Sequence, residues 1–329
     1  MSGQYTEPLM SRSRRLPTVP LAPAATPVEE LHNLRRALGG GPRLLVKRDD
    51  ALTFAFGGNK VRKLQLVAAD AVAAGADTLI TSGGIQSNHA RVTAAAAAKL
   101  GLHCILVANG TPPEKATANA LLDRLLGADV RYVAGRSDRA PAMEEAASEL
   151  RSAGRRPYLI PIGASTSLGA VGFISAVEEL QSQVERWPDV VIHSTSSGGT
   201  QAGLVAGCAL ADAETRIIGV SADESSGILG RDIRNILAGI PDLLDLPAGR
   251  FAHVQVEVDD RFVGGGYGVP TEQSREALEL LARTEALFLD PTYTAKAMAG
   301  LIARVRAGEF PEDQTVLFWH TGGQVGLFA

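Results

Sequence analysis

The stretch LLVKRDDALTFAFGGNKVRKLQLVAADAVAAGADTLITS (residues 44–82) contains one strand–helix–strand unit. Residues 44–48 and 77–82 are short apolar runs that include β-branched side chains, and residues 60–75 between them have a helical pattern. Strands that are apolar throughout and separated by helices are typical of parallel sheets covered on both faces. This unit therefore predicts an α/β protein.

The same alternation continues toward the C-terminus. Further strands are predicted at 103–109, 128–135, 157–162, 189–196, 216–222 and 315–323. Helices are predicted at 87–101, 116–127, 140–154, 168–185, 199–211, 274–286 and 294–308, and the chain after Ala222 is expected to be mainly helical. With about nine candidate strands, two doubly wound αβα domains with mainly parallel sheets and a cleft between them fit better than one sheet.

Composition excludes several classes of partner. The net charge of −4 and the absence of a Lys/Arg block argue against nucleic acid. The sequence has no apolar run of the roughly 18 residues that would span a membrane. Residues 1–30 lack the apolar core of a secretory signal, and Glu7 with several prolines favours an irregular arm, so we expect a cytoplasmic protein.

The two cysteines suggest neither a disulfide nor a metal. Cys104 falls in a predicted strand and Cys208 in a predicted helix, and neither has a CxxC or Cys/His spacing. We expect both to be small buried side chains, with no metal site.

Lys60 stands where a cation is unfavourable. Gly57 and Gly58 allow a sharp turn, Asn59 can cap a helix, and Lys60 comes at the helix N-terminus, where the macrodipole disfavours positive charge. A chemical role is therefore needed to explain a lysine at this position. By contrast, Lys47, Arg62 and Lys63 are interpreted as solvated or ion-paired surface residues.

Three glycine- or hydroxyl-rich turns follow predicted strands, at 81–91, 193–204 and 320–327. Ligands of parallel sheets bind at such turns. In the second, residues 196–200 (SSGGT) open a helix, so backbone N–H groups and hydroxyls converge on one point. The turn either holds a phosphate or only packs the helix close to its strand. It has neither the P-loop lysine nor a GxGxxG pattern.

A lysine at a helix start, a phosphate cup and no nucleotide fingerprint together suggest pyridoxal phosphate, which needs an amine for its aldehyde and a cup for its phosphate. A nucleotide-dependent oxidoreductase or kinase that uses the same turns is the alternative from another enzyme class. A non-catalytic amino-acid-binding module is a third possibility.

Six motifs in order carry a resemblance to a known family: KRDD…GGNKVRKL (47–64), SGGIQSNHAR (82–91), SSGGTQAGL (196–204), GYGVP (266–270), LDPTYTAKAMAGL (289–301) and HTGG (320–323). They resemble the D-cysteine desulfhydrase and 1-aminocyclopropane-1-carboxylate (ACC) deaminase family of pyridoxal-phosphate enzymes, which have fold type II, the tryptophan-synthase-β-like fold. The resemblance implies a cofactor in the cleft between a large domain (1–62 plus 173–329) and a small domain (63–172). It also implies a small amino-acid substrate and a homodimer.

The resemblance assigns roles to individual residues. Lys60 matches the family's Schiff-base lysine and proton-abstracting base, and the other catalytic residues implied are Ser87, Tyr267 and Tyr293. The cofactor-binding residues implied are Lys60, Asn88, Ser197, Gly198, Gly199, Thr200 and Thr294. The substrate-binding residues implied are Ser87, Asn88, His89, Tyr267 and Tyr293. In this scheme Asn88 bonds the ring hydroxyl, and Thr294 faces the pyridine nitrogen.

Thr294 and His89 favour one activity within the family. ACC deaminases have glutamate at the position of Thr294 and glutamine at that of His89. A threonine shares only a neutral hydrogen bond, so the cofactor is a weaker electron sink. This favours α,β-elimination of a D-amino acid, with D-cysteine as the best candidate, over ring opening of ACC. An L-cysteate sulfo-lyase is a further alternative.

The chain also departs from the family pattern near the expected substrate cleft. The departures are Phe54, Phe56, Thr292, Ala295 and Val325. We expect Phe54 and Phe56 to influence which substrate enters.

Overall fold

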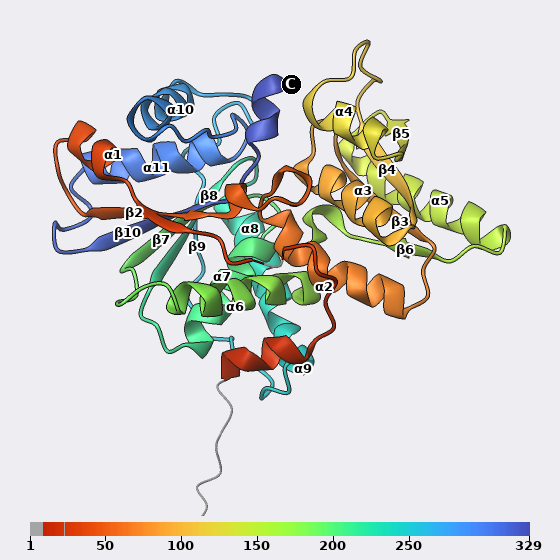
Figure 1. Ribbon diagram of the computed structural model, residues 1–329, viewed down its shortest axis with the longest axis horizontal. Coiled ribbons are helices and arrows are strands. Elements are labelled where there is room, and N and C mark those ends of the chain that lie inside the picture. The colour runs from red at the N-terminus through yellow and green to blue at the C-terminus, as the bar shows by residue number, and fades with distance from the viewer. Residues whose placement is uncertain (1–8, 23) are drawn as a thin grey trace, which may run out of the picture.

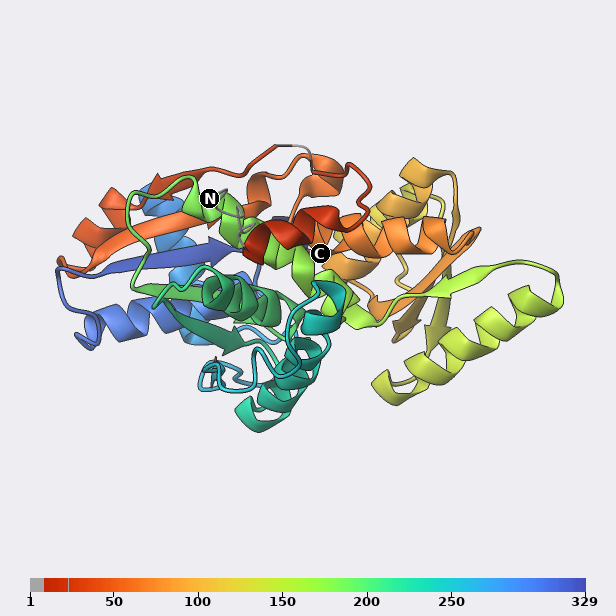
Figure 2. The same ribbon diagram turned by 90° about the horizontal axis from the view of Figure 1, so that it is seen from below.

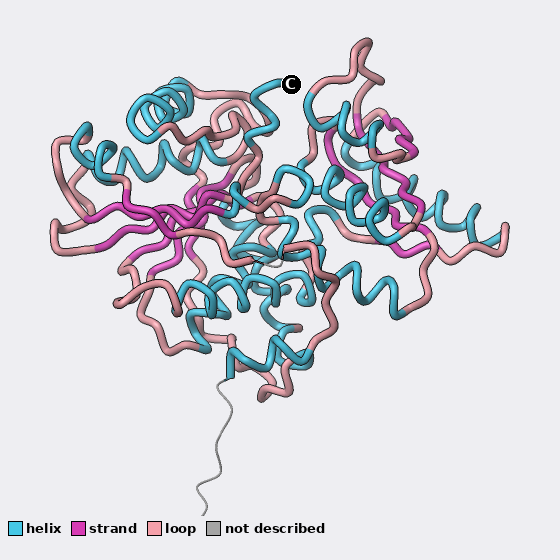
Figure 3. Tube along the Cα trace, viewed as in Figure 1, coloured by secondary structure: helices cyan, strands magenta, loops and turns pink. Residues whose placement is uncertain are grey.

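A computed structural model describes residues 9–22 and 24–329 (Figure 1). The described residues form two β-sheets with helices on both faces of each (Figure 3). The larger sheet has six strands in the order β1-β2-β10-β7-β8-β9. Their bounds are β1 Val28–Glu30, β2 Arg43–Arg48, β10 Thr315–His320, β7 Val190–Thr195, β8 Arg216–Ser221 and β9 Glu257–Asp259. β1 is antiparallel to β2, and the other neighbouring pairs are parallel.

The smaller sheet has four parallel strands in the order β5-β4-β3-β6. They are β3 Thr78–Gly84, β4 His103–Asn109, β5 Asp129–Val133 and β6 Pro157–Leu159. This sheet and the helix α5 (Arg139–Ser152) lie to one side of the larger sheet, as Figure 2 shows from below. The chain enters this part through α2 (Lys60–Ala73) and returns through α6 (Ser167–Gln181). The exact domain bounds, 1–62 plus 173–329 and 63–172, stay a prediction.

Alternating side chains of the larger sheet fill two separate cores. Val190 and Ile192 pack with α1 (His32–Ala37), α10 (Glu272–Glu285) and α11 (Thr294–Arg306) on one face. Val191 packs with α6, α7 (Gly199–Leu210) and α8 (Ser226–Ala238) on the other face, and the short α9 (Ile240–Leu243) adjoins them. This period of two between the faces is the geometry of a strand buried on both sides.

The smaller sheet is built in the same way. Leu79 and Leu106 pack against α2 and α3 (Asn88–Leu100), with α4 (Ala118–Leu125) beside α3. Ile80 and Val107 pack on the opposite face against α5. Both sheets are therefore the centre of an αβα sandwich, which confirms the predicted fold class.

The predicted strands and helices are all present, with small shifts at their ends. No range was predicted for β1, α1, α8, α9 and β9 or for the short 3-10 helices, although the chain after Ala222 was expected to be mainly helical. Residues 1–8 of the expected irregular arm lie outside the described residues. The rest of that arm is not wholly irregular, because it includes a 3-10 helix at Leu9–Arg15 and the strand β1. Cys104 and Cys208 are buried and free, as expected.

Lys47 and Arg62 are not surface residues, although the sequence had suggested that they were. Arg62 Nη2 lies 2.8 Å from Asp49 Oδ1, Lys47 Nζ lies 2.5 Å from Glu179 Oε1, and Arg62 Nη1 lies 2.9 Å from Glu179 Oε2. Burial alone would raise the pKa of Glu179, but hydrogen bonds from the two cations lower it to about 2. The ion pairs are internal and join α2, β2 and α6, which fixes the helix that begins with Lys60.

No helix in residues 9–22 and 24–329 is both long enough and apolar enough to cross a membrane.

Candidate active site

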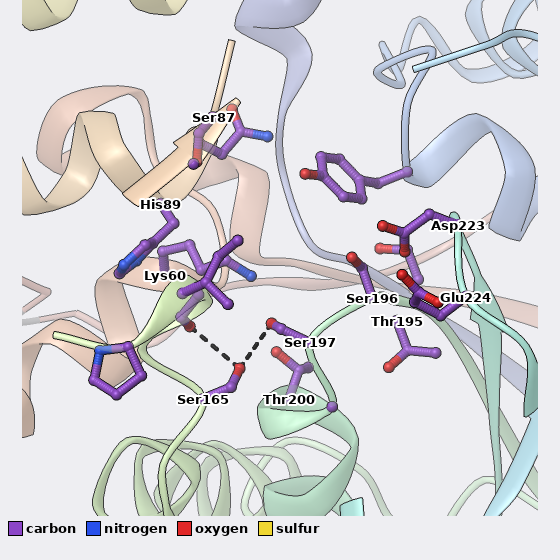
Figure 4. Close-up of a pocket in the computed structure, with 18 of the residues that line it drawn as sticks. Lys60, Ser87, His89, Ser165, Thr195, Ser196, Ser197, Thr200, Asp223 and Glu224 are labelled. Carbon is purple, nitrogen blue, oxygen red and sulfur yellow. Dashed lines mark hydrogen bonds between the residues drawn. The ribbon is translucent and has the colours of Figure 1, made fainter. Parts of the chain in front are cut away.

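One cavity of about 590 Å³ collects most of the residues singled out in the sequence (Figure 4). Its walls come from the start of α2 and from the loops that follow β3, β7, β8 and β10, so it lies at the carboxyl ends of parallel strands. The predicted residues in its wall are Lys60, Ser87, Asn88, His89, Ser197, Gly198, Thr200, Tyr267 and Tyr293. Gly199 and Thr294 are not in the wall.

Lys60 is the first residue of α2, as predicted, and lines the cavity. Its amine forms no hydrogen bond or ion pair with any residue that the structure describes. Burial lowers the pKa of Lys60 to about 8, against the opposing charge of Asp290. A lysine with this pKa has a substantial neutral fraction near neutral pH, which is what a nucleophile or a general base needs.

The turn before Lys60 is held by backbone contacts. Gly57 and Gly58 both have positive φ, at 68° and 97°. Gly58 N donates to Asp49 O, and Asn59 N donates to Thr321 O at the end of β10. Asn59 does not cap the helix with its side chain, contrary to expectation. Its Nδ2 donates instead to Thr200 Oγ1 across the cavity, at 2.9 Å.

Residues 197–200 form a cup at the start of α7. Gly198 has a φ of 77° and Gly199 is the first helical residue, so the backbone turns its N–H groups toward one point. Ser197 Oγ lies 2.7 Å from Ser165 Oγ (Figure 4). Gly199 N donates to Ser165 Oγ at 3.3 Å. A Cβ on Gly199 would lie 2.7 Å from Ser165 Oγ and also 2.7 Å from Lys63 Nζ. A side chain at position 199 would therefore collide with Ser165 and Lys63, so glycine is required there.

Lys63 supplies a buried amine to this cup, which corrects its interpretation as a surface residue. The side chain is 0% exposed, and Nζ donates to Gly163 O at 3.2 Å and to Ser165 Oγ at 3.1 Å. No carboxylate among the described residues pairs with it. Burial and the neighbouring Lys60 hold the pKa of Lys63 well below its ordinary value. A buried amine surrounded by hydroxyls and N–H groups fits a phosphate.

The start of α3 presents a second set of donors. Ser87 caps the helix, because its Oγ accepts from Ala90 N. Asn119 Nδ2 donates to Asn88 Oδ1 at 2.9 Å, so the Asn88 amide presents its Nδ2 as a free donor. The Ser87 hydroxyl proton and the first N–H groups of α3 are suited to a carboxylate.

His89 lines the cavity in a defined tautomer. Thr81 Oγ1 donates its one proton to Ile160 O at 2.8 Å, so His89 Nε2, 2.8 Å from the same hydroxyl, must be the donor to it. His89 Nδ1 is buried, unprotonated and without a partner among the residues that the structure describes. Burial and the nearby lysines keep the pKa of His89 well below its usual value. The side chain thus presents an acceptor, so the expected contact of His89 with a carboxylate would have to use its backbone N–H.

Tyr267 and Tyr293 meet in the opposite wall. Their hydroxyl oxygens are 2.5 Å apart, and the rings pack edge to face. Asp290 holds this arrangement by accepting from the backbone N–H of Tyr293 and Thr294, at 2.9 Å each. Burial raises the pKa of Tyr293 well above its ordinary value, and burial also raises the pKa of Tyr267. Both phenols therefore stay protonated at neutral pH and can donate a proton.

Thr294 is placed differently from the expectation that it faces the ring nitrogen. It is fully buried beside the cavity, and its Oγ1 donates to Asp290 Oδ1 at 2.7 Å while accepting from Asp290 N. The Thr294 hydroxyl is thus engaged by Asp290 at the start of α11. A different hydroxyl pair does line the cavity, since Ser194 Oγ and Thr321 Oγ1 lie 2.7 Å apart at the ends of β7 and β10.

Sequence reasoning missed several residues of this wall: Lys63, Ser165, Ser194, Thr321, Arg136 and Arg139. A signal existed for Lys63, which lies one helical turn after Lys60 and so shares its face. Thr321 stands within the recognised HTGG motif. Ser194 falls in the hydroxyl-rich turn at 193–204, whereas Ser165, Arg136 and Arg139 carry no local pattern.

The aromatic departures do not line the cavity. Phe56 is 58% exposed and Phe54 packs beside the core of the smaller sheet. Thr292, Ala295 and Val325 are also absent from the wall. The expectation that the two phenylalanines influence substrate entry is therefore not supported by their position.

Fold, lysine and phosphate cup together define a fold type II pyridoxal-phosphate protein. Comparison with known proteins gives the same class. Residues 19–322 match the family described as pyridoxal-phosphate-dependent enzymes, and the chain belongs to that family. The nucleotide-dependent alternative is thereby overturned.

Solved structures extend this comparison. An ACC deaminase homologue is 35% identical, with a TM-score of 0.90, and the match covers 98% of this chain and 97% of the other. The processed form of threonine deaminase isoform 2 from Solanum lycopersicum is 18% identical, with a TM-score of 0.69 over 96% of this chain and 83% of the other. A pyridoxal 5'-phosphate-dependent aspartate racemase is 18% identical, with a TM-score of 0.67 over 91% and 90%. The threonine deaminase and the aspartate racemase show only that the fold is shared.

Proposed function

We propose that this enzyme catalyses α,β-elimination of a small D-amino acid, with D-cysteine as the preferred substrate. The products are pyruvate, ammonia and hydrogen sulfide. One observation carries the proposal: a lysine of lowered pKa and a tyrosine pair of raised pKa share one cavity. Groups whose pKa values are driven apart in this way are suited to act as base and acid.

The cavity accounts for each part of the cofactor. Lys60 would hold its aldehyde carbon through Nζ, and Lys63, Ser197, Gly199 and Thr200 would hold its phosphate. Asn88 Nδ2 would be the donor for the ring hydroxyl. We assign the ring nitrogen to the Ser194–Thr321 hydroxyl pair, because that pair lines the cavity and the Thr294 hydroxyl is used by Asp290.

Bound pyridoxal phosphate supplies the electron sink that makes the Cα proton of an amino acid acidic. Lys60 Nζ would remove that proton. Ser87 and the N–H groups of α3 orient the substrate carboxylate. The Tyr267–Tyr293 pair protonates the sulfur as the Cβ–S bond breaks and the bonding electrons leave with it. The three-carbon product takes up water and yields pyruvate and ammonia.

A hydroxyl pair at the ring nitrogen, in place of a carboxylate, supports elimination over ring opening. A neutral hydrogen bond does not hold the ring nitrogen protonated, so negative charge at Cα is less stabilised. Elimination tolerates this because the leaving group takes up the electron pair as the proton is removed. The likeness to an ACC deaminase homologue keeps ring opening as the competing outcome of the test.

The test combines Lys60→Ala with a substrate panel. The purified wild-type protein should be yellow and release pyruvate and sulfide from D-cysteine, and pyruvate from β-chloro-D-alanine. Lys60→Ala should lose both the borohydride-sensitive colour and turnover, whereas Lys99→Ala, an exposed lysine of α3, should keep both. Sulfite from L-cysteate or 2-oxobutanoate from ACC as the main product would replace the proposal by that activity. A yellow protein inactive on the whole panel would favour a binding module.

The homodimer implied by the resemblance and the cytoplasmic location stay predictions.

A further inference from the structure

Lys296 is a buried lysine that has no part in the chemistry described so far. It lies on α11, within the motif at 289–301, but its side chain is 0% exposed and does not line the cavity. Its Nζ donates to three backbone carbonyl oxygens: Val263 O and Gly266 O, at 2.8 Å each, and Ala222 O, at 3.0 Å. No carboxylate in the described part of the chain forms a salt bridge with it.

These three contacts require the charged form of the amine. Only a protonated amine has three N–H donors, and Lys296 uses all of them. Burial lowers the pKa of Lys296, and the charges of Asp223 and Asp290 oppose that effect. Loss of the ammonium would deprive three carbonyl groups of a donor in a buried place, which is costly. The side chain is therefore a strong link between the segments whose carbonyls it binds.

The link connects the two tyrosines of the cavity wall. Tyr293 is the residue before α11, and Lys296 follows it by three positions, in the first turn of that helix. Gly266, whose carbonyl Lys296 binds, directly precedes Tyr267. The amine thus joins the helix next to one phenol to the loop that carries the other, and the two hydroxyl oxygens lie 2.5 Å apart.

The loop that carries Tyr267 has little structure of its own. Residues 260–270 contain no helix or strand and include the run GGGYG at 264–268. The glycine directly before Tyr267 has a φ of 108°. Such a stretch loses much conformational freedom when it becomes ordered, so it needs anchors. Phe262 packs against the core beside α11, and Lys296 provides a polar anchor nearer to the tyrosine.

We propose that Lys296 is a positioning residue for the proton donor of the elimination. Its ammonium holds the Tyr267 loop against α11, so that the two phenols meet in the geometry that delivers a proton to the leaving group. This inference rests on the proposed function and adds to it a residue outside the cavity wall. Placement matters because a small displacement of an acid from the reacting atom lowers the rate strongly.

The test replaces Lys296 in the holoenzyme and compares two substrates. Lys296→Met removes the ammonium at similar side-chain length, whereas Lys296→Gln retains some N–H donors. With Lys296→Met, kcat for D-cysteine should fall roughly 10- to 100-fold and kcat for β-chloro-D-alanine less than about 3-fold, because chloride leaves without a proton. Lys296→Gln should lose less. Arg306→Met, which removes an exposed cation at the other end of α11, should match the wild type.

A double variant shows whether Lys296 acts through the tyrosines. Adding Lys296→Met to Tyr293→Phe should lower kcat for D-cysteine by less than about 3-fold more, because the pair is already disabled. Each Lys296 variant should stay yellow, since the residue does not line the cavity. Loss of the colour, equal losses on the two substrates or an additive loss in the double variant would assign Lys296 to stability alone and overturn the inference.

Tyrosine ionisation in the cofactor-free protein gives a readout apart from turnover. Burial raises the pKa of Tyr267 and of Tyr293. A released loop admits water, so both pKa values should fall toward the ordinary value in Lys296→Met but not in Arg306→Met. Ultraviolet difference absorbance measures this, and the same proteins carrying Tyr267→Phe isolate that phenol.

The two proposals fail in different ways. An unchanged tyrosine titration in Lys296→Met would overturn the role of Lys296. A shifted titration, combined with a wild-type enzyme that is inactive on every substrate of the panel, would instead overturn the proposed elimination.

Discussion

Asn59 and Thr200, 141 residues apart in the chain, are joined by a hydrogen bond of 2.9 Å from Nδ2 to Oγ1. Asn59 precedes the cavity lysine, and Thr200 belongs to the cup at the start of α7. The bond therefore fixes the distance between an amine that would hold one end of the cofactor and donors that would hold the other. It also explains why this asparagine does not cap α2.

Breaking this bond should affect both stability and cofactor binding. With Asn59→Ala, a buried hydroxyl loses its donor, so we expect the free energy of unfolding to fall by about 1–2 kcal/mol and the Kd of pyridoxal phosphate to rise several-fold. Thermal unfolding and a spectroscopic titration measure the two effects. Asn33→Ala, an exposed asparagine of α1, is the control. Unchanged cofactor affinity in Asn59→Ala would show that the bond has no role in the site.

Lys63→Met should weaken binding of the cofactor's phosphate while leaving the rest of the site unaffected. The variant loses a buried amine that a bound phosphate would pair with in its protonated form, so the affinity for pyridoxal phosphate should fall roughly 10- to 100-fold. Binding of pyridoxal, which lacks the phosphate, should change little. The cofactor-free protein should not unfold more easily, because methionine replaces a buried amine whose charged form is disfavoured by burial. Lys99→Met serves as the surface control, and an equal loss for both aldehydes would contradict the assignment.

The pKa of Lys60, about 8, predicts the pH dependence of cofactor capture. Only the neutral amine attacks an aldehyde, so the rate for the cofactor-free protein should rise about tenfold per pH unit below 8 and level off by about pH 9. Stopped-flow absorbance follows this rate. A rate that still climbs steeply between pH 9 and 10 would show that Lys60 has the ordinary lysine pKa instead. Since the folded pKa lies below the unfolded one, this group also makes the free energy of unfolding increase with pH from about 8 to about 10.5.

Tyr293→Phe tests the proton donor for the leaving group. Sulfide departs more easily when protonated, so kcat for D-cysteine should fall about 10²-fold or more. Chloride needs no proton, and β-chloro-D-alanine should lose much less. Tyr158→Phe is a matched control, since that tyrosine bonds Asp70 outside the cavity. Equal losses on the two substrates would assign Tyr293 a positioning role only.

The sequence predicted what local pattern controls. Apolar runs of β-branched residues indicated the strands of both sheets, and their alternation with helices indicated the αβα layers, because burial on both faces leaves this signature in a short window. Lys60 was also evident locally, since a cation at a helix N-terminus conflicts with the helix dipole. The glycines and hydroxyls after β7 also marked the cup locally, because they lie together in one short turn.

Residues whose roles depend on distant neighbours could not be predicted. Lys63 differs from a surface lysine only because residues 163 and 165 close over it, about 100 positions later. The Thr294 hydroxyl is taken by Asp290, although its motif suggested a free contact with the cofactor.

The sequence by itself thus determined the fold class and the kind of cofactor and predicted Lys60 as the reactive amine, because each follows from patterns within short stretches of chain. Only the tertiary structure decided which hydroxyls and cations enter the cavity. Side-chain direction and burial arise when elements far apart in the chain pack together, and Lys63, an ordinary helix lysine in the sequence, acquires its buried position beside Gly163 and Ser165 only there.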